Sequence, residues 1–289
     1  MSFFSPLPHR ALVSVQGADR FSFLQGMISN DVRHVESGEA MWAAFLTPQG
    51  KFLHEFFAVP HNDVVLLECE RDRRADLITR LSRYRLRAKV TLAPNDTLAV
   101  GVAWGADAAS LLKTTETLGA VAPLGAGVLY TDPRVLKAGV RFALPADHAS
   151  LEKLGLKSAD YDAHRISLGL PDGSRDLEVE KALLLENGFA ELHGVDFNKG
   201  CYIGQELTAR THYRALVKKR LMPVAIDGET PATGAPITAN GADAGEIRSV
   251  AGNKGLALVR LSAWRGGGVL EAGRAKITPQ PPAWMDLPE

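Results

Sequence analysis

The chain has 289 residues, of which 46% are hydrophobic and 23% are charged. These proportions are typical of a folded protein with one large or two smaller domains, and they exclude a disordered chain. The 33 Lys and Arg residues balance the 33 Asp and Glu residues, so no overall positive charge favours DNA or an acidic membrane.

The cysteines and the apolar runs indicate the compartment. Cys69 and Cys201 form neither a CxxC pair nor a disulfide framework, which suits a reducing environment. The first ten residues lack the pattern of a secretory signal peptide, and no apolar run approaches the length of a membrane span. We therefore expect a cytoplasmic protein without membrane contact.

The first part of the chain predicts strands and one capped helix. The pattern predicts a strand at 9–17, a helix at 20–28 with Asp19 as its cap, two strands within 41–59 and a strand at 62–70. The triplet Pro48-Gln49-Gly50 is typical of a turn and is expected to join the two strands of 41–59.

A basic segment follows, with seven arginines and one lysine between residues 71 and 89. Apolar spacing predicts a helix at 74–84 and then a strand at 85–90, on which Arg85, Arg87 and Lys89 would share one face. Such a face is usually only solvated, but it also suits a polyanion, either an RNA backbone or a chain of glutamyl carboxylates.

The rest of the chain completes an α+β fold. The pattern predicts a strand at 97–105, a helix from 106, a strand at 140–145, and a helix at 158–168 that ends at Gly169 and Pro171. After about residue 214, short strands separated by DG, NG and GG turns predict a small β-barrel. We therefore divide the chain into an α+β region (1–213), a barrel (214–280) and a loose tail (281–289) on which Trp284 and Met285 could dock.

The stretch KGCYIGQE, residues 199–206, holds the most informative cysteine. Gly200 and Gly204 permit positive φ, and a helix that begins near Gly204 would place Glu206 in its first turn. Cys201 would then lie just before a helix N-terminus and two residues from Lys199, and both features favour a thiolate. The residues alone leave open whether Cys201 is reactive or is a small buried residue in a tight turn.

No protein-held metal is predicted. The stretch HEFFAVPH has Ala58 where an HExxH motif needs its second histidine. Two isolated thiols cannot supply the four cysteines of an ordinary iron–sulfur cluster.

The motif KGCYIGQE followed by LTAR resembles the signature of the YgfZ family. That family is a branch of the superfamily containing the folate-dependent aminomethyltransferase of the glycine cleavage system. Three further stretches agree in the same order, and the match spans nearly the whole chain. They are FLQGMISNDV, DPRVLKAGVRFALP, and YDAHRISLGLPDGSRDL leading to LLLEN.

The resemblance implies a folate-binding region of two intertwined α+β subdomains, closed by the barrel around a central channel. It implies a tetrahydrofolate-binding accessory protein for iron–sulfur cluster assembly or repair, with indirect effects on tRNA modification. Its partners would be iron–sulfur enzymes or assembly factors, and we expect a monomer. Carried over to this chain, the folate contacts would be Lys199, Tyr202, Arg165, Glu186, Asn30 and Asp31, with Gly200, Gly204, Gln205 and Glu206 completing the motif and Cys201 as the candidate catalytic residue.

Two departures argue against glycine-cleavage chemistry. The aminomethyltransferase carries an acidic residue soon after a Gly-Gly turn, whereas this chain has PQGKFLHEFF, with Lys51 after a single glycine. The usual proline before the glutamate of LLLEN is also replaced. The alternative to an accessory protein is a one-carbon transferase that uses Glu55 or Asp31 to position a folate nitrogen. A weaker third hypothesis is RNA binding through residues 71–89, against which the neutral net charge counts.

Overall fold

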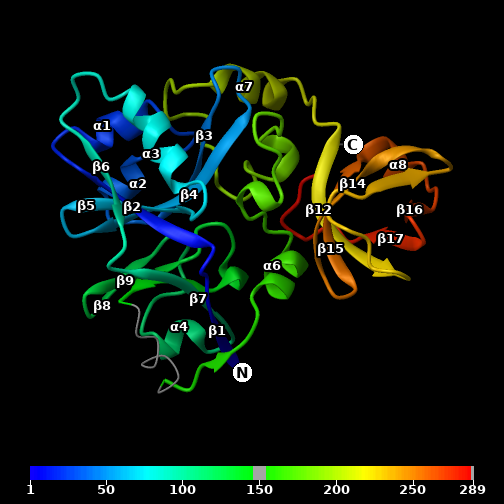
Figure 1. Ribbon diagram of the computed structural model, residues 1–289, viewed down its shortest axis with the longest axis horizontal. Helices are drawn as coiled ribbons and strands as arrows, with labels where there is room; N and C mark the ends of the chain where they lie inside the picture. Colours follow the sequence, from blue (N-terminus) through cyan, green and yellow to red (C-terminus); the bar gives the residue numbers. More distant parts are fainter. Residues whose placement is uncertain (146–153, 288–289) are drawn as a thin grey trace. The chain divides into compact units, whose positions relative to one another are not determined.

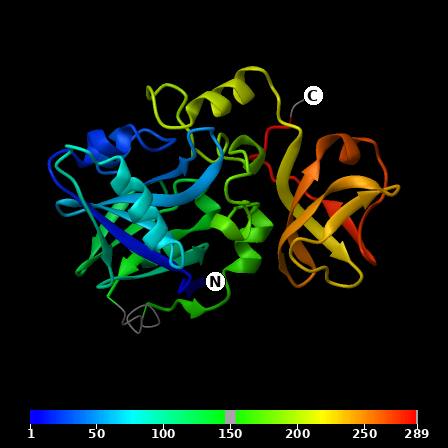
Figure 2. The same cartoon turned by 45° about the horizontal axis from the view of Figure 1, so that its top comes forward.

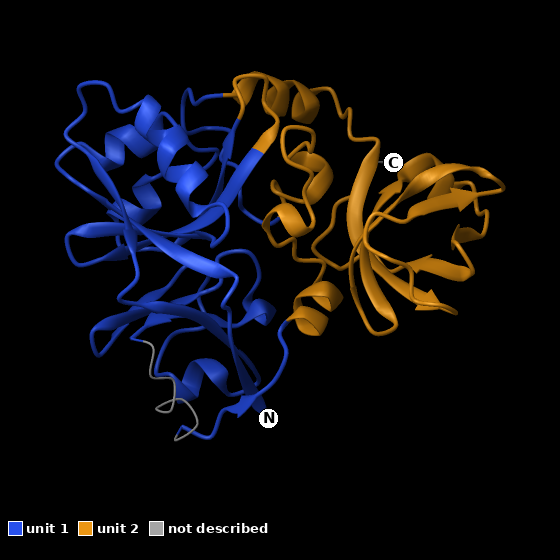
Figure 3. Ribbon diagram, viewed as in Figure 1, with its two compact units in different colours: residues 1–46, 53–161, 192–203 blue, residues 47–52, 162–191, 204–289 orange. Residues whose placement is uncertain are grey.

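The computed structural model describes residues 1–145 and 154–287, which divide into two compact units (Figure 1, Figure 3). Unit 1 comprises residues 1–46, 53–161 and 192–203, and unit 2 comprises 47–52, 162–191 and 204–289. The division therefore differs from the expected boundary at 213, because two internal segments group with the barrel. The chain passes from unit 1 to unit 2 inside the KGCYIGQE motif, after Ile203.

Unit 1 contains two sheets in which the order of the strands does not follow the sequence. The first runs in the order β3, β4, β5, β2, β6, which are Met41–Leu46, Phe52–His61, Val64–Glu70, Arg10–Gln16 and Thr91–Asn95. The second runs in the order β11, β1, β7, β10, β9, β8, which are Lys157–Ser158, Ser2–Pro6, Ala99–Gly105, Val140–Leu144, Gly127–Thr131 and Val121–Leu124. Nearly every side chain of β2, β3 and β4 is buried, which explains why these strands are mostly apolar on both faces, although Arg10, His54 and Glu55 are buried there too.

Short helices cover these sheets. They are α1 (Arg20–Gln25), α2 (Arg33–Glu36), α3 (Arg74–Arg83), α4 (Ala108–Leu111) and the 3-10 turn η1 (Leu136–Ala138). Helix α3 packs on β2 and β6 and buries Leu77 and Leu81, four residues apart on one face. The predicted strands and helices up to residue 84 are thus confirmed, with one correction. Asp19 makes no side-chain cap to α1 but accepts the backbone N–H of Lys89 at 2.7 Å.

Unit 2 contains the closed barrel, which Figure 2 shows from a second direction. Its order is β12, β15, β14, β13, β16, β17, which are Lys219–Asp227, Lys254–Arg260, Ala242–Ala251, Pro236–Ala239, Leu270–Ala272 and Ala275–Pro279. The remaining helices of unit 2 are α6 (Asp162–Leu168), α7 (Gln205–Tyr213), α8 (Leu261–Arg265), η2 (Gly173–Arg175) and η3 (Leu185–Asn187).

The tail beyond residue 280 is docked rather than loose, as far as Leu287. The indole N–H of Trp284 donates to the carbonyl of Leu168 at 2.8 Å. Met285 is buried in the apolar core of the barrel. The two residues that were expected to be able to dock therefore do so.

Candidate functional site

Hydrogen bonds from Lys199 anchor the first half of the KGCYIGQE motif to the end of helix α1. Its side chain is buried, and Nζ donates to the carbonyl of Gln25 and, at 2.9 Å, to the carbonyl of Ile28. The ammonium also lies 4.8 Å from the ring centroid of Tyr202. Burial lowers the pKa of Lys199 to about 8, against the opposing effect of nearby Asp31, Asp196 and Cys201.

Further hydrogen bonds fix the same loop along its length. The side-chain amide of Gln25 donates to the carbonyl of Lys199 at 3.1 Å. The backbone N–H groups of Asp196 and Ile203 donate to the carbonyls of Ser29 and Gly26, at 3.0 and 3.2 Å. Segments about 170 residues apart in the chain are thus joined, and the loop that carries Cys201 is held at both ends.

The two cysteines have opposite environments. Cys201 is exposed and free, whereas Cys69 is buried in β5, where burial raises the pKa of its thiol to about 12. The hypothesis that Cys201 is a small buried turn residue is therefore wrong. The helix predicted to begin near Gly204 is confirmed, since α7 starts at Gln205 with Gly204 as its N-cap and Glu206 in its first turn. The effect of a helix dipole falls off within one turn of the helix end. The position of Cys201 in the chain, four residues before Gln205, therefore does not by itself place its thiol within reach of the α7 dipole.

Asn30 and Asp31 lie next to this loop but are engaged with the protein. The amide of Asn30 donates to the carbonyls of Trp42 and His193, at 2.8 and 2.7 Å. The carboxylate of Asp31 pairs with Arg33, whose hydrogen bond lowers the pKa of Asp31 to about 2. Both side chains therefore shape the loop's surroundings in unit 1.

A cavity in unit 1 was not predicted from the sequence. It has a volume of about 440 Å³ and is lined by Asn30, His34, Glu39, Met41, Leu118, His193, Phe197, Asn198 and a few neighbours. No local motif marks it, because its walls come from four separate parts of the chain.

The second half of the motif belongs to unit 2. Gly204 has φ of 81°, so a left-handed residue precedes α7, and Gln205 and Glu206 form the first turn of that helix. The turn residue Gly50 packs against this helix start. A Cβ atom at Gly50 would lie 2.7 Å from the carbonyl oxygen of Gly204 and 2.7 Å from Cβ of Leu207.

Two predicted folate contacts, Arg165 and Glu186, also lie in unit 2. Arg165 is buried and donates to Asp162, Asp176 and Ser249, at 2.6, 2.7 and 3.1 Å. Burial alone would lower the pKa of Arg165, but the charge of Asp176 and the other aspartates raises it. Arg165 therefore joins α6 to the barrel strand β14.

Glu186 lines a cavity of about 340 Å³ in unit 2, together with Asn187, Lys181, Lys219, Arg248 and several acidic residues. Burial raises the pKa of Glu186, and the positive charges of Lys219 and Lys51 oppose that shift. The six predicted folate contacts are thus divided between the units, four in unit 1 and two in unit 2.

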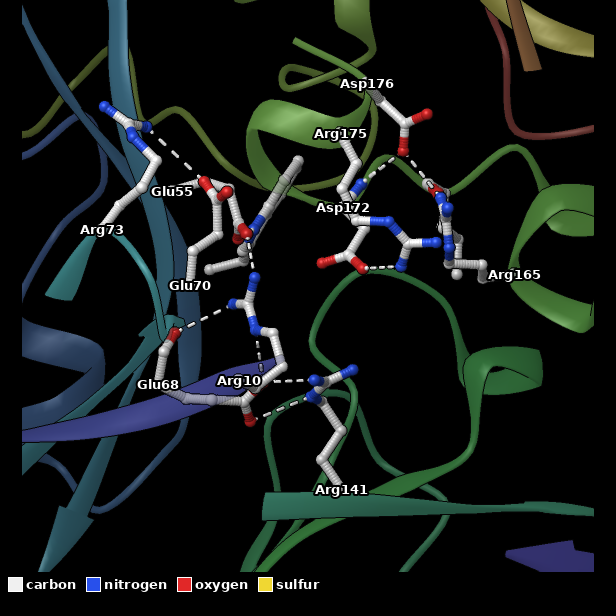
Figure 4. A network of polar contacts seen from close by, with 12 residues as sticks. Arg10, Glu55, Glu68, Glu70, Arg73, Arg141, Arg165, Asp172, Arg175 and Asp176 are labelled. Atoms are coloured by element: carbon white, nitrogen blue, oxygen red, sulfur yellow. Dashed lines mark hydrogen bonds and ion pairs between the residues drawn. The ribbon is translucent and has the colours of Figure 1, made fainter. Parts of the chain in front are cut away.

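A buried ion-pair network joins the two sheets of unit 1 (Figure 4). Arg10 pairs with Glu55 and Glu68, and Arg141 pairs with Glu68, all with side chains almost fully buried. The second carboxylate oxygen of Glu55 accepts the indole N–H of Trp42 at 2.6 Å. Both oxygens of Glu55 are therefore engaged, and those of Asp31 are engaged too, so nothing here favours the transferase alternative.

The predicted strand at 85–90 is wrong. Residues 84–90 form turns and irregular chain between α3 and β6, and Leu86 has φ of 44°. Arg85, Arg87 and Lys89 are exposed but do not share a strand face. The alternation of cations and apolar residues resembled a strand, yet Leu86 is exposed rather than packed in the core.

Among residues 1–145 and 154–287, no three His, Cys, Asp or Glu side chains are placed to hold a metal ion. Within the same residues no helix is long and apolar enough to cross a membrane.

With this geometry in place, the chain can be compared with known proteins. A family described as "CAF17, C-terminal beta-barrel domain" matches residues 218–287. The mitochondrial iron-sulfur cluster assembly factor IBA57 of Mus musculus is 37% identical, over 90% of this chain and 78% of its own length. The human IBA57 protein is 36% identical, over 88% of this chain and 76% of its own. The chain belongs to the IBA57 family.

The fold of this IBA57-family chain is that of a glycine cleavage aminomethyltransferase. The crystal structure of glycine cleavage system aminomethyltransferase T from Bartonella henselae matches it with a TM-score of 0.79, over 98% of this chain and 86% of that one. The identity is 15%, so the likeness concerns the fold alone. The predicted α+β fold with a terminal barrel is confirmed, and the relatives named here are IBA57 rather than YgfZ proteins.

The expected cytoplasmic location is contradicted by the IBA57 family. The mouse, human and Coccidioides immitis relatives are all named as mitochondrial. The prediction rested on the absence of recognisable targeting patterns and on two unpaired cysteines, and neither feature distinguishes one reducing compartment from another.

Proposed function

We propose that this chain is an iron–sulfur cluster assembly factor that binds tetrahydrofolate or a derivative and depends on the thiol of Cys201. Membership of the IBA57 family supports the role in cluster assembly. The aminomethyltransferase-like fold supports a folate ligand.

The observation that carries the proposal is the exposure of Cys201 on a loop that Lys199 fastens to the body of unit 1. An exposed thiol can meet groups of a second molecule, which a buried one cannot. The fastening fixes where that thiol is presented, because Lys199 lies only two residues away and its side chain is buried.

The cavity that contains Glu186 supports the folate part. Its 340 Å³ falls within the usual range of small-molecule sites, about 300–1,000 Å³. A pterin presents a row of N–H donors, for which the Glu186 carboxylate is a suitable acceptor. Lys219 lines the same cavity and supplies a positive charge for an anionic glutamate tail, whereas Lys181 and Arg248 are paired with acidic residues of the lining.

The thiol is tested by comparing Cys201→Ser with Cys69→Ser in cells that lack the wild-type protein. We expect Cys201→Ser to lose most activity of a cluster-dependent enzyme while the variant stays folded. Alkylation of the native protein should label Cys201 and spare Cys69 until denaturation. Full enzyme activity with Cys201→Ser would remove the thiol from the mechanism.

The folate is tested by titrating tetrahydrofolate, with and without a polyglutamate tail, against the wild-type protein. Glu186→Gln should weaken binding about tenfold or more, the effect of losing one charge-assisted hydrogen bond. Glu116→Gln, at an exposed position in unit 1, is the matched control and should bind like the wild type. A wild-type protein that binds neither form would remove folate from the proposal.

A further inference from the structure

The basic segment between residues 71 and 89 divides into two halves with different surroundings. In the first half the guanidinium groups are used by the fold. Arg71 donates to the carbonyls of Pro8 and Arg10, Arg73 to that of Leu53, and Arg74 and Arg80 pair with Asp96 and Asp76. In the second half, Arg83, Arg85, Arg87 and Lys89 are exposed, and within the described parts of the chain none of the four pairs with a carboxylate. Residues 83–89 are called the basic turn below.

The basic turn also exposes a large apolar side chain. Leu86 is 89% exposed, which makes it the most exposed large apolar side chain among the described residues. Its φ of 44° lies in the left-handed region, which is unfavourable for a leucine. The backbone thus holds Leu86 away from the core, with a positive charge on each side of it.

Exposed cations can bind RNA, an acidic membrane or an acidic protein. The side chains of Tyr84 and Leu86 distinguish these three kinds of ligand. Single-stranded RNA needs aromatic faces for stacking, but the Tyr84 ring packs edge-on against Phe45, with centroids 6.1 Å apart. A membrane needs more apolar surface than one exposed leucine supplies. A protein interface suits both features, since arginines and a buried apolar anchor are typical of its energetic centre.

Helix α1 connects the basic turn to the loop of Cys201. At its N-terminal side, Asp19 accepts the backbone N–H of Lys89 at 2.7 Å. At its C-terminal end, the Gln25 carbonyl accepts from Lys199. The six residues of α1 span about 9 Å, so one partner surface can reach both features.

We propose that the basic turn docks an acidic protein partner whose surface has an apolar hollow for Leu86. This inference rests on the proposed function, because it supplies the partner with which the chain would assemble clusters. Charge complementarity sets the rate and orientation of the encounter, and Leu86 fixes its register.

The test places a photo-crosslinking amino acid at position 86 of the full chain, in cells that depend on it. Position 136 is the control, because Leu136 is also an exposed leucine of unit 1. We expect position 86, and not position 136, to crosslink to a protein at a peptide containing several Asp or Glu residues. The yield of the crosslink at position 86 should fall at least tenfold with R85E/R87E. It should persist with the control K113E/K157E, which makes the same charge change at exposed positions elsewhere in unit 1.

Activity separates this proposal from the proposed function. Leu86→Asp should lower the activity of a cluster-dependent enzyme at least fivefold, while Leu136→Asp leaves it unchanged. A crosslink to RNA or lipid, or equal crosslinking at 86 and 136, would overturn the docking proposal even if Cys201→Ser abolishes activity. Normal activity with Cys201→Ser would instead remove the thiol from the proposed function, whether or not position 86 crosslinks.

Discussion

The ammonium group of Lys199 is held almost out of water by the carbonyls of Gln25 and Ile28. Burial lowers its pKa to about 8, from 10.5 in an unfolded chain. Between these two values the unfolded chain binds this proton more tightly than the folded protein. The contribution of Lys199 to stability therefore increases as the pH rises from 8 to 10.5.

This dependence can be measured on Lys199→Met, which removes the charged amine and leaves an unbranched side chain one atom shorter. The wild-type free energy of unfolding, relative to that of the variant, should increase between pH 8 and pH 10. Urea unfolding at several pH values measures the difference. At pH 7.5 the variant should also exchange the amide hydrogens of residues 196–203 faster, because the loop loses two hydrogen bonds. A difference that falls with pH would contradict the assigned burial of the ammonium.

At the scale of elements, the turn at Pro48-Gln49-Gly50 supports the start of α7. Gly50 has φ of 81°, and an added Cβ would collide with Gly204 and Leu207. We expect Gly50→Ala to lower the free energy of unfolding by about 1–3 kcal/mol, the usual effect of overpacking. Gly38→Ala is the matched control, since Gly38 also has positive φ but no atom within 4 Å of its Cβ position. If the free energy of unfolding falls equally in the two variants, backbone strain at positive φ, rather than the collision of the added Cβ, causes the loss of stability.

Most helices and strands could be predicted from the sequence, but the apolar pattern failed at several places. Apolar periodicity located α3, α6 and the strands β2 to β5, because those side chains face a core. It failed at residues 85–90, where Leu86 has the spacing of a strand but an exposed side chain. It also missed α8, which is too short for a period to appear. The exposure of Cys201 was left open, because it depends on contacts with residues about 170 positions away.

At the scale of the whole molecule, each unit is held by its own buried ion pairs. Unit 2 has Arg165 with Asp162 and Asp176. Unit 1 has the network of Arg10, Glu55, Glu68 and Arg141, whose members come from strands far apart in the sequence. No local pattern could predict these partners, and two of the charged site candidates from the sequence, Glu55 and Arg165, belong to these ion pairs.

Glu68→Gln tests how far unit 1 depends on its network. Burial alone would raise the pKa of Glu68, but Arg141 and Arg10 outweigh burial and lower it below 4.5. Removing one partner of a buried ion pair typically costs about 3–5 kcal/mol, so the variant should unfold at clearly lower urea concentration at pH 7. The stabilising charge is present above the unfolded pKa of about 4.5 and is lost as the pH falls through the lower folded value. The difference in the free energy of unfolding between the wild type and Glu68→Gln should therefore decrease below pH 4.5. The control variant Glu116→Gln, at an exposed position, should have the stability of the wild type at every pH. A gap that stays constant down to pH 3 would mean that Glu68 stabilises unit 1 by packing, rather than by its charge.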